Sequence, residues 1–220
     1  GSTASVYLVM AQTHPEQKSH GINTLIIEKN WPGVSVGTKE NKLGIRGSDT
    51  TSVMFDNVKV PKENRIGEDG FGFKFAMRTL AGGRIGIASQ ALGIAAGAFE
   101  LALRYAKERK AFGQEIMHHQ AIQFKLSDMA TKIEAARLLC LKAAWVKDQH
   151  QEYAQHSSMA KVFASETAMW TAIEAVQILG GYGFVKEYHV ERLMRDAKIT
   201  QIYEGTSEVQ RIVISRSLLQ

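Results

Sequence analysis

Three long stretches with helical periodicity constrain this chain more than any other feature. In the first two, apolar residues recur at steps of four and three positions, which places them on one face of an α-helix. The first stretch carries Ile87, Ala91, Ile94, Ala98, Leu101 and Tyr105, and the second carries Ile122, Leu126, Met129, Ile133, Ala136, Cys140 and Ala143. A third helix is expected from about Ser157 to Leu179, with Val162, Met169, Ile173 and Val176 inside it and Gly180-Gly181 ending it. Shorter helices are expected near His189 to Asp196 and Ser207 to Leu218. Long helices with short connections predict an antiparallel bundle.

The N-terminal part of the chain has the pattern of strands and turns. Short runs rich in β-branched and aromatic residues occur at Val6–Met10, Asn23–Ile27, Val34–Val36 and Ser52–Val58. The polar stretch Pro61–Gly70 then separates the strands from the helices. We therefore predict an α+β fold that is mostly α. Its domains are a partial β-barrel or sheet domain at residues 1–67 and a C-terminal helical bundle at residues 68–220.

Composition excludes several classes of function. The 27 Lys and Arg residues, which give a net charge of +5, are spread along the chain without a basic stripe or zinc-finger pattern, so no nucleic-acid binding is expected. His118 and His119 are adjacent and would point in different directions on a helix, and no metal site is predicted. No uninterrupted apolar run approaches about 20 residues, so no membrane span is predicted. A single cysteine, Cys140, favours a reducing interior compartment.

The sequence Ile202-Tyr203-Glu204-Gly205-Thr206 places a carboxylate in a turn just before a helix. Ser207 and Gln210 have the S-x-x-Q spacing of a capping box, which predicts that this helix starts at Ser207. The partial positive charge at a helix start favours an ionised carboxylate, which is a suitable setting for a general base. From the local pattern alone, a glutamate that only complements the helix dipole is the simpler interpretation.

Two further motifs are candidates for binding phosphate. Gly180-Gly181-Tyr182-Gly183 allows backbone N–H groups to approach an anion, although a turn that ends a helix has the same composition. It follows a helix and not a strand, which excludes the dinucleotide-binding fingerprint of a βαβ unit. The segment from Arg109 to Gly113 joins two cations to Phe112, and arginine matches phosphate oxygens with its planar fork. A basic helix C-terminus is the alternative interpretation.

Together these motifs are similar to the signature of the acyl-CoA dehydrogenase family, over the whole chain and most closely to its short-chain, butyryl-CoA branch. The resemblance rests on Gln177-x-x-Gly180-Gly181-x-Gly183-Phe184-x-x-Glu187, followed by Arg192 and Asp196. It also rests on Gly82-Gly83-Arg84, Arg109-Lys110-x-Phe112-Gly113, His119-Gln120-Ala121-Ile122-Gln123 and Tyr203-Glu204-Gly205-Thr206, in the order and spacing of that family.

The resemblance implies an FAD-dependent oxidoreductase of fatty acid β-oxidation. It would convert a short- to medium-chain acyl-CoA into the trans-2-enoyl-CoA. Glu204 matches the base that removes the α-proton while hydride passes to flavin N5, and its own N–H would help hold the thioester carbonyl. Some members of the family place the base at the position of Gly83, which glycine excludes here.

The same resemblance assigns binding residues, partners and location. Positions expected to contact FAD are Arg109, Phe112, Gln120, Gln177, Gly180, Gly181, Thr206 and Glu208. Positions expected to line the acyl-CoA pocket are Gly83, Arg84, Tyr203 and Gly205. It also implies a homotetramer, a dimer of dimers that shares FAD across subunits, and an electron-transfer flavoprotein as the redox partner. The expected location is the bacterial cytoplasm or the mitochondrial matrix.

Two departures from the family pattern limit the resemblance. Ala81 stands where an acidic residue commonly precedes Gly-Gly-Arg. The N-terminal helical domain and the first half of the β-domain have no counterpart, so we expect a C-terminal fragment. Two alternatives stay open: an acyl-CoA oxidase-like flavoenzyme on the same scaffold, and a non-catalytic helical interaction module.

Overall fold

The computed structural model describes residues 1–219, which form two compact units. The first unit comprises Gly1–Lys42 and Arg46–Leu80, and the second comprises Leu43–Ile45 and the chain from Ala81 onward. Described separately, the first is built mainly of strands and the second mainly of helices.

The first unit contains two small antiparallel sheets. β1 (Val6–Gln12) pairs with β2 (Ile22–Glu28), which also pairs with the short β5 (Arg65–Ile66), while β3 (Val34–Lys39) pairs with β4 (Thr51–Phe55). Short 3-10 helices lie at Pro15–Gly21 (η1) and Lys62–Asn64 (η2). All four predicted strand regions are confirmed, and no closed barrel is formed by the described residues. β4 ends at Phe55 and not at Val58, and Asn57 has a left-handed φ of 51°.

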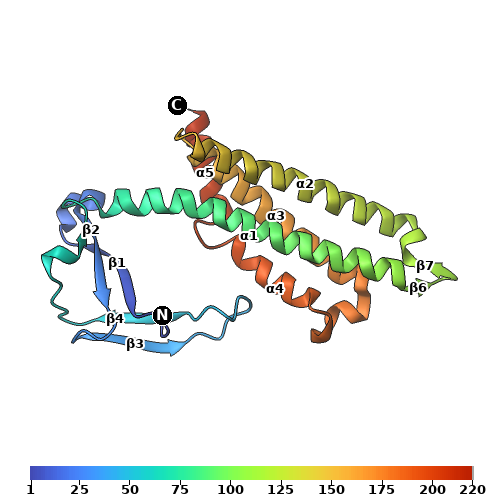
Figure 1. The fold of residues 1–220 in the computed structure, drawn as a ribbon, viewed down its shortest axis with the longest axis horizontal. Helices are drawn as coiled ribbons and strands as arrows, with labels where there is room; N and C mark the ends of the chain where they lie inside the picture. The colour runs from blue at the N-terminus through green and yellow to red at the C-terminus, as the bar shows by residue number, and fades with distance from the viewer. Residues whose placement is uncertain (220) are drawn as a thin grey trace. The chain divides into compact units, whose positions relative to one another are not determined.

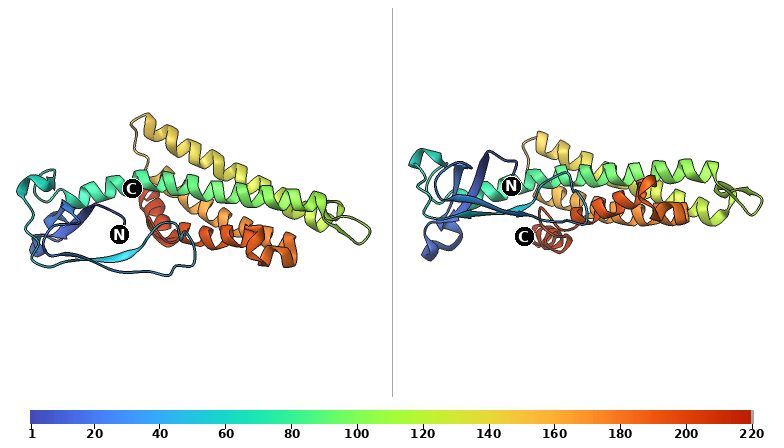
Figure 2. Two further views of the ribbon diagram at one scale, coloured as in Figure 1. Left: turned by 60° about the horizontal axis from the view of Figure 1, so that its bottom comes forward. Right: turned by 90° about the horizontal axis from the view of Figure 1, so that it is seen from below.

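The second unit is a helical bundle in which α1, α2 and α3 run side by side (Figures 1 and 2). A two-stranded hairpin and a 3-10 turn connect α1 to α2, and two 3-10 turns connect α3 to α4. In chain order the elements are α1 (Gly72–Glu108), β6 (Lys110–Ala111), β7 (Gln114–Glu115), η3 (Ile116–His118), α2 (Gln120–Asp148), α3 (Ala154–Leu179), η4 (Gly180–Phe184), η5 (Lys186–Tyr188), α4 (Val190–Thr200) and α5 (Ser207–Leu218). The predicted α+β, mostly helical fold is confirmed.

Alanines form the contact surfaces of the bundle. Fully buried alanines repeat along α1 at 88, 91, 95, 98, 102 and 106, and along α3 at 160, 164, 168, 172 and 175. The predicted stripe of α2 is confirmed from Met129 to Ala143. The third predicted helix is confirmed and contains all four residues expected inside it, although Val162, Met169 and Val176 are only partly buried and Ile173 is 44% exposed. Small side chains take the central positions because they allow the helix backbones to approach closely.

α1 also contains a long apolar stretch. It contains an 18-residue window of mean hydropathy 1.4, which by length and composition alone is enough to cross a membrane. Only 28% of that window is buried within the described residues, and core helices of soluble proteins pass the same test. The prediction that the chain has no membrane span therefore stays a prediction.

A loop segment is fastened to α4 within the second unit. Arg195 donates from Nη1 to the carbonyl oxygen of Leu43 (2.9 Å), and Asp196 accepts a hydrogen bond from the backbone N–H of Ile45 (2.6 Å). A Cβ on Gly44 would lie 2.5 Å from the carbonyl oxygen of Arg195, so only glycine fits between them. The signature residue Asp196 thus has a structural contact in this loop.

Overpacking the alanine surface should destabilise the bundle. We expect Ala164→Leu to lower the free energy of unfolding by about 1–3 kcal/mol, because the added atoms have no space between α3 and its neighbours. Urea unfolding followed by circular dichroism measures this change. The same substitution at the exposed Ala130 of α2 is the control, and an equal loss from both variants would contradict tight packing at Ala164.

Candidate active site

The turn between α4 and α5 has an unusual backbone. Glu204 has φ 55° and Gly205 has φ 91°, so two consecutive residues occupy the left-handed region. For glutamate this conformation costs free energy that the surroundings must supply. The turn is closed by hydrogen bonds from the N–H of Tyr203 to the carbonyl of Ile199 (3.1 Å) and from Ser207 to Gln201 (3.0 Å).

The start of α5 differs from the predicted capping box by one residue. Thr206 is the N-cap, and its Oγ1 accepts a hydrogen bond from the backbone N–H of Val209 (3.4 Å). Ser207 is the first helical residue, and its buried Oγ has no hydrogen-bond partner among the described residues. The side chain of Gln210 turns back into the turn and does not complete a capping box. The predicted helix start at Ser207 is therefore confirmed, whereas the predicted capping box is wrong.

Gln210 and Lys161 hold the carbonyl groups of the turn. The Nε2 of Gln210 donates to the carbonyl oxygens of Glu204 (3.1 Å) and Gly205 (2.9 Å), and the Nζ of Lys161 donates to that of Gly205 (2.7 Å). The backbone N–H of Glu204 donates no hydrogen bond to any described residue. One residue therefore presents both a carboxylate and a free N–H donor.

The carboxylate of Glu204 lies directly against α1 at Gly83. A Cβ built on Gly83 would be 2.6 Å from Oε2 and 3.2 Å from Cδ of Glu204. Both distances are too short for a side chain to be added without displacing the carboxylate. Gly83 therefore makes room for Glu204, in addition to being unable to serve as a base itself.

Two buried cations lie near this carboxylate. Arg84 is 7% exposed and donates from Nη1 to the Oγ of Ser158 (3.3 Å), while its Nε has no partner among the described residues. Burial lowers the pKa of Arg84, and the negative charge of Glu204 opposes that shift. Lys161 is fully buried on α3, and its pKa is lowered to about 8 by burial and by Arg84, against the opposing charges of Glu208 and Glu204.

Tyr203 is fixed by α1. Its hydroxyl group donates a hydrogen bond to Oε1 of Gln90. Burial raises the pKa of Tyr203, the hydrogen bond to Gln90 opposes this, and the charge of Glu204 adds to the rise. The structure thus brings together Gly83, Arg84, Tyr203, Glu204, Gly205 and Thr206, which were all predicted as site residues.

Glu208 and Thr206 lie on the other side of the turn. They line a small polar pocket of about 210 Å³ together with Ser207, Lys198 and Glu166. A backbone N–H and the hydroxyl of Thr206 hold the pKa of the Glu208 carboxyl below its ordinary value, with Arg211 and Lys198 adding to this.

The remaining predicted residues gather at the opposite end of the bundle. Arg109 and Phe112 follow α1, Gln120 begins α2, and Gln177, Gly180 and Gly181 end α3. Phe112 has φ 54° and is 96% exposed, with its ring 5.9 Å from that of His119. A Cβ at Gly180 or Gly181 would meet nothing within 4 Å. The backbone of this loop is therefore open to approach.

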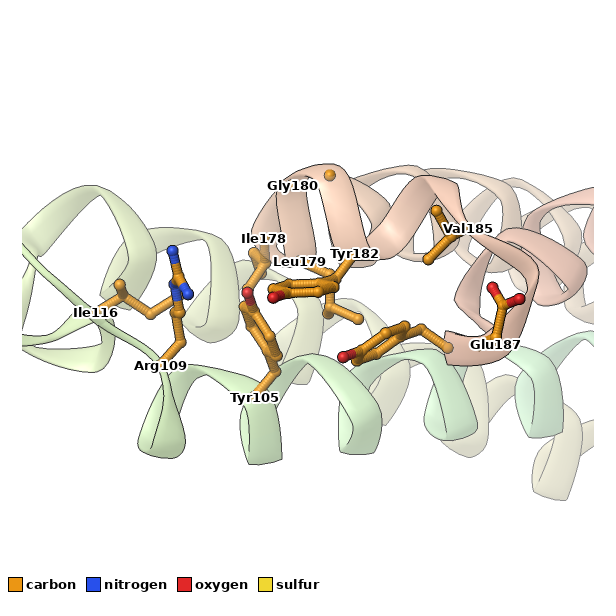
Figure 3. Close-up of a pocket in the computed structure, with 11 residues that line it drawn as sticks. Tyr105, Arg109, Ile116, Ile178, Leu179, Gly180, Tyr182, Val185 and Glu187 are labelled. Atoms are coloured by element: carbon orange, nitrogen blue, oxygen red, sulfur yellow. The ribbon is translucent and has the colours of Figure 1, made fainter.

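A cavity of about 680 Å³ lies beside this loop (Figure 3). Arg109, Tyr105 and Tyr182 line it, with Gly180, Gly181 and Glu187 among the other lining residues. The guanidinium of Arg109 lies 6.0 Å from the ring centre of Tyr182, which in turn packs against Tyr105 and Tyr188. Gln120 and Gln177 do not line this cavity.

The two groups of residues are far apart on one chain. Gly83 and Arg109 are 26 residues apart in the sequence and are joined by α1. At about 1.5 Å per residue, the helix separates them by about 39 Å. The cavity beside Gly180-Gly181 is thus distant from Glu204, and the residues near Gly83 and those near Arg109 cannot face a single small ligand within one chain.

Sequence reasoning missed the residues that hold the turn from below, namely Lys161, Gln210 and Gln90. A signal was present for Lys161, because it lies four residues after Ser157 and three before Ala164 on the buried face of α3. A lysine on a face of small residues is a buried charge that needs a partner. Gln210 was assigned to a capping box instead of to the turn. No sequence pattern distinguished Gln90 from other polar residues of the first helix.

Within residues 1–219, no group of three or more His, Cys, Asp or Glu side chains is arranged to hold a metal ion. The absence of a metal from the function remains a prediction.

Comparison with known proteins identifies the family. The fold defines a helical-bundle protein with a carboxylate in a left-handed turn against α1. The chain matches the family description "Acyl-CoA dehydrogenase, C-terminal domain" over residues 70–219 and "Acyl-CoA dehydrogenase, middle domain" over residues 1–58. The chain belongs to the acyl-CoA dehydrogenase family, whose members are FAD-dependent flavoprotein oxidoreductases and typically homotetramers.

Individual relatives agree with this assignment. An acyl-CoA dehydrogenase of Bacillus subtilis is 54% identical over 100% of this chain and 58% of its own length. The mitochondrial short-chain specific acyl-CoA dehydrogenase of Mus musculus is 50% identical over 99% of the chain and 53% of its own length. The relatives thus include bacterial and mitochondrial proteins, and the chain spans a little over half of their length.

Two solved structures have the same fold. The butyryl-CoA dehydrogenase of Megasphaera elsdenii superposes with a TM-score of 0.98 at 51% identity, covering 100% of this chain and 57% of that one. A chain from the study titled "Electron transferring flavoprotein of Acidaminococcus fermentans: Towards a mechanism of flavin-based electron bifurcation" superposes with a TM-score of 0.98 at 53% identity, covering 100% and 58%.

The buried Lys161 should make stability depend on alkaline pH. Its folded pKa of about 8 lies below the ordinary value of 10.5, so between these values the unfolded chain binds more protons. The free energy of unfolding should therefore rise with pH across this window. Comparison of urea unfolding in wild type and Lys161→Met isolates the contribution of this side chain. Parallel pH curves for the two proteins would show that Lys161 titrates normally.

Proposed function

We propose that the whole protein oxidises a short- to medium-chain acyl-CoA to its trans-2-enoyl-CoA, with Glu204 as the base. The observation that carries the proposal is the pairing of a carboxylate and an unpartnered backbone N–H on Glu204. The carboxylate removes the α-proton of the thioester. The electron pair of that C–H bond becomes the second bond between the α- and β-carbons as hydride leaves the β-carbon.

The free N–H of Glu204 has a complementary role in this proposal. Negative charge develops on the thioester oxygen as the α-proton leaves, and a donor that is already oriented stabilises it without reorganisation. Arg84 and Lys161 add buried positive charge behind the turn. Gly83, Tyr203 and Gly205 would line the acyl pocket around this centre.

Two groups of residues fit FAD, one beside the C-terminal end of α1 and one beside the Glu204 turn. In the first group, the fork of Arg109 and the open backbone at Gly180-Gly181 suit phosphate oxygens, and the exposed ring of Phe112 suits an aromatic ring system. Gln120 and Gln177 would add amide contacts there. In the second group, Thr206 and Glu208 border a pocket that holds the orphaned hydroxyl of Ser207. When bound, FAD supplies the hydride acceptor at N5.

The length of α1 supports sharing of FAD between subunits. A separation of about 39 Å between Gly83 and Arg109 is longer than one dinucleotide cofactor. The Arg109 end of one chain would therefore serve the Glu204 end of a second copy, which makes a dimer the smallest complete unit. A dimer of dimers would match the homotetramer that is typical of the family.

The electron acceptor and the location follow from the same relatives. We propose an electron-transfer flavoprotein as the partner, since a chain from a study of such a flavoprotein shares this fold at 53% identity. The bacterial cytoplasm or the mitochondrial matrix is the proposed location, which suits the single buried cysteine.

Removal of the base should abolish the reaction. In the full-length protein, Glu204→Gln is expected to slow the bleaching of bound flavin by butyryl-CoA by about 10²–10⁴-fold, since the amide cannot accept the α-proton. Stopped-flow absorbance measures the rate. The control is Glu134→Gln on the exposed face of α2, and a wild-type rate in the Glu204 variant would rule out this base.

Crowding the carboxylate should also impair the reaction. Gly83→Ala places a Cβ 2.6 Å from Oε2 of Glu204 and should reduce the bleaching rate by about 10- to 100-fold. Gly86→Ala, one turn along the same helix, is the matched control because a Cβ there meets nothing within 4 Å. Equal rates in the two variants would show that the carboxylate does not work from this position.

A further inference from the structure

Lys161 is a fully buried lysine beneath the turn that carries Glu204. It is the largest fully buried side chain of the described residues, and it lies on a face of α3 otherwise occupied by serine and alanine. Burying an ammonium group is expensive unless it is paired and hydrogen-bonded. Its one recorded hydrogen bond goes to the carbonyl oxygen of Gly205, the residue that follows Glu204.

The hydrogen bond from Lys161 fixes the orientation of a peptide group in the turn. Because the peptide plane is rigid, the Gly205 carbonyl that points toward Lys161 on α3 directs the N–H of the same peptide, which belongs to Thr206, the opposite way. Gln210 and Lys161 hold the carbonyls of Glu204 and Gly205 on the inner side. This arrangement maintains the left-handed backbone of both residues, which is unfavourable for glutamate.

The charges around Lys161 lead to the same conclusion. The groups that face it are Arg84 from α1, Glu204 from the turn and Glu208 from α5. Two buried cations side by side repel each other, and the carboxylates compensate them. The ammonium group is therefore kept at a cost beside a carboxylate, where an apolar side chain of the same length would pack more cheaply.

We propose that Lys161 is a positioning residue for Glu204. Its ammonium group anchors the Gly205 carbonyl and so fixes the reversed turn that aims the carboxylate at the space above Gly83. Lys161 does not touch the reacting atoms and acts only through the turn. The kinetic consequence of this inference rests on the proposed function, whereas the consequence for the backbone does not.

The test compares Lys161→Met, Lys161→Gln and wild type in the full-length protein. Methionine keeps the length of the side chain and removes both the charge and the donor, while glutamine keeps a donor without charge. Since burial lowers the pKa of Lys161 to about 8, its charged form is unfavourable in the fold at neutral pH, and Lys161→Met should be at least as stable as wild type there. A lower unfolding midpoint would identify Lys161 as a merely structural residue and overturn the proposal.

Hydrogen exchange followed by mass spectrometry tests the turn without substrate. The amides of Tyr203 and Ser207 are hydrogen-bonded only while the turn is closed. We expect them to exchange about tenfold faster in Lys161→Met, because one hydrogen bond from a charged donor is lost. Lys125→Met, which removes a lysine paired with Glu174 on α3, is the control and should leave this segment unchanged. Unchanged exchange in Lys161→Met would overturn the proposal.

Stopped-flow bleaching by butyryl-CoA then tests the link to the base. Lys161→Met should react about 10- to 100-fold more slowly at saturating substrate with similar substrate affinity, and Lys161→Gln should fall between it and wild type. A wild-type rate in Lys161→Met would overturn the inference. If wild type itself is not bleached by any saturated acyl-CoA, the proposed function fails, and the exchange measurement still decides the role of Lys161 in the turn.

Discussion

The anchoring of two backbone carbonyl groups is the interaction on which this site depends. The left-handed backbone conformation is unfavourable for glutamate, and the local Glu-Gly sequence does not stabilise it. Hydrogen bonds from Gln210 of α5 and Lys161 of α3 to the carbonyls of Glu204 and Gly205 stabilise this conformation. The turn conformation therefore depends on tertiary contacts with two helices. These buried polar contacts offset its backbone strain.

Close helix packing is the condition that allows this arrangement. The fully buried alanines of α1 and α3 let backbones approach, so that Gly83 on α1 comes within contact of the carboxylate. Larger residues on these faces would separate the helices and open the site to water. The alanine-rich core and the geometry of the turn thus both depend on the close approach of the helices.

Sequence alone predicted much of the fold, because its signals are periodic. The stripe from Met129 to Ala143 and the end of α3 at Gly180 depend on local spacing and punctuation, which the sequence displays. The sequence does not show which face of α3 is buried, because the exposed Ile173 is more hydrophobic than the alanines that occupy the core. β5 escaped prediction because two residues cannot show a period.

Some residues of the candidate site could also be predicted from the sequence, whereas others could not. Glu204 and Gly83 were found through motif similarity, and their contact explains why the motif has a glycine. Gln210 was assigned to a capping box because the local pattern fits one, whereas the structure uses Thr206 as the cap. Which residue caps α5 depends on tertiary contacts to the turn, such as that of Lys161 from α3. The local sequence does not contain this information.

The single helix that joins both groups of residues has a genetic consequence. Because Arg109 and Glu204 of one chain would serve different flavins, a chain defective at one position and a chain defective at the other are complementary. In a mixed dimer, one centre would receive both defects and the other would receive none. Two inactive alleles would then restore activity when expressed together, a behaviour that a centre built within one polypeptide cannot produce.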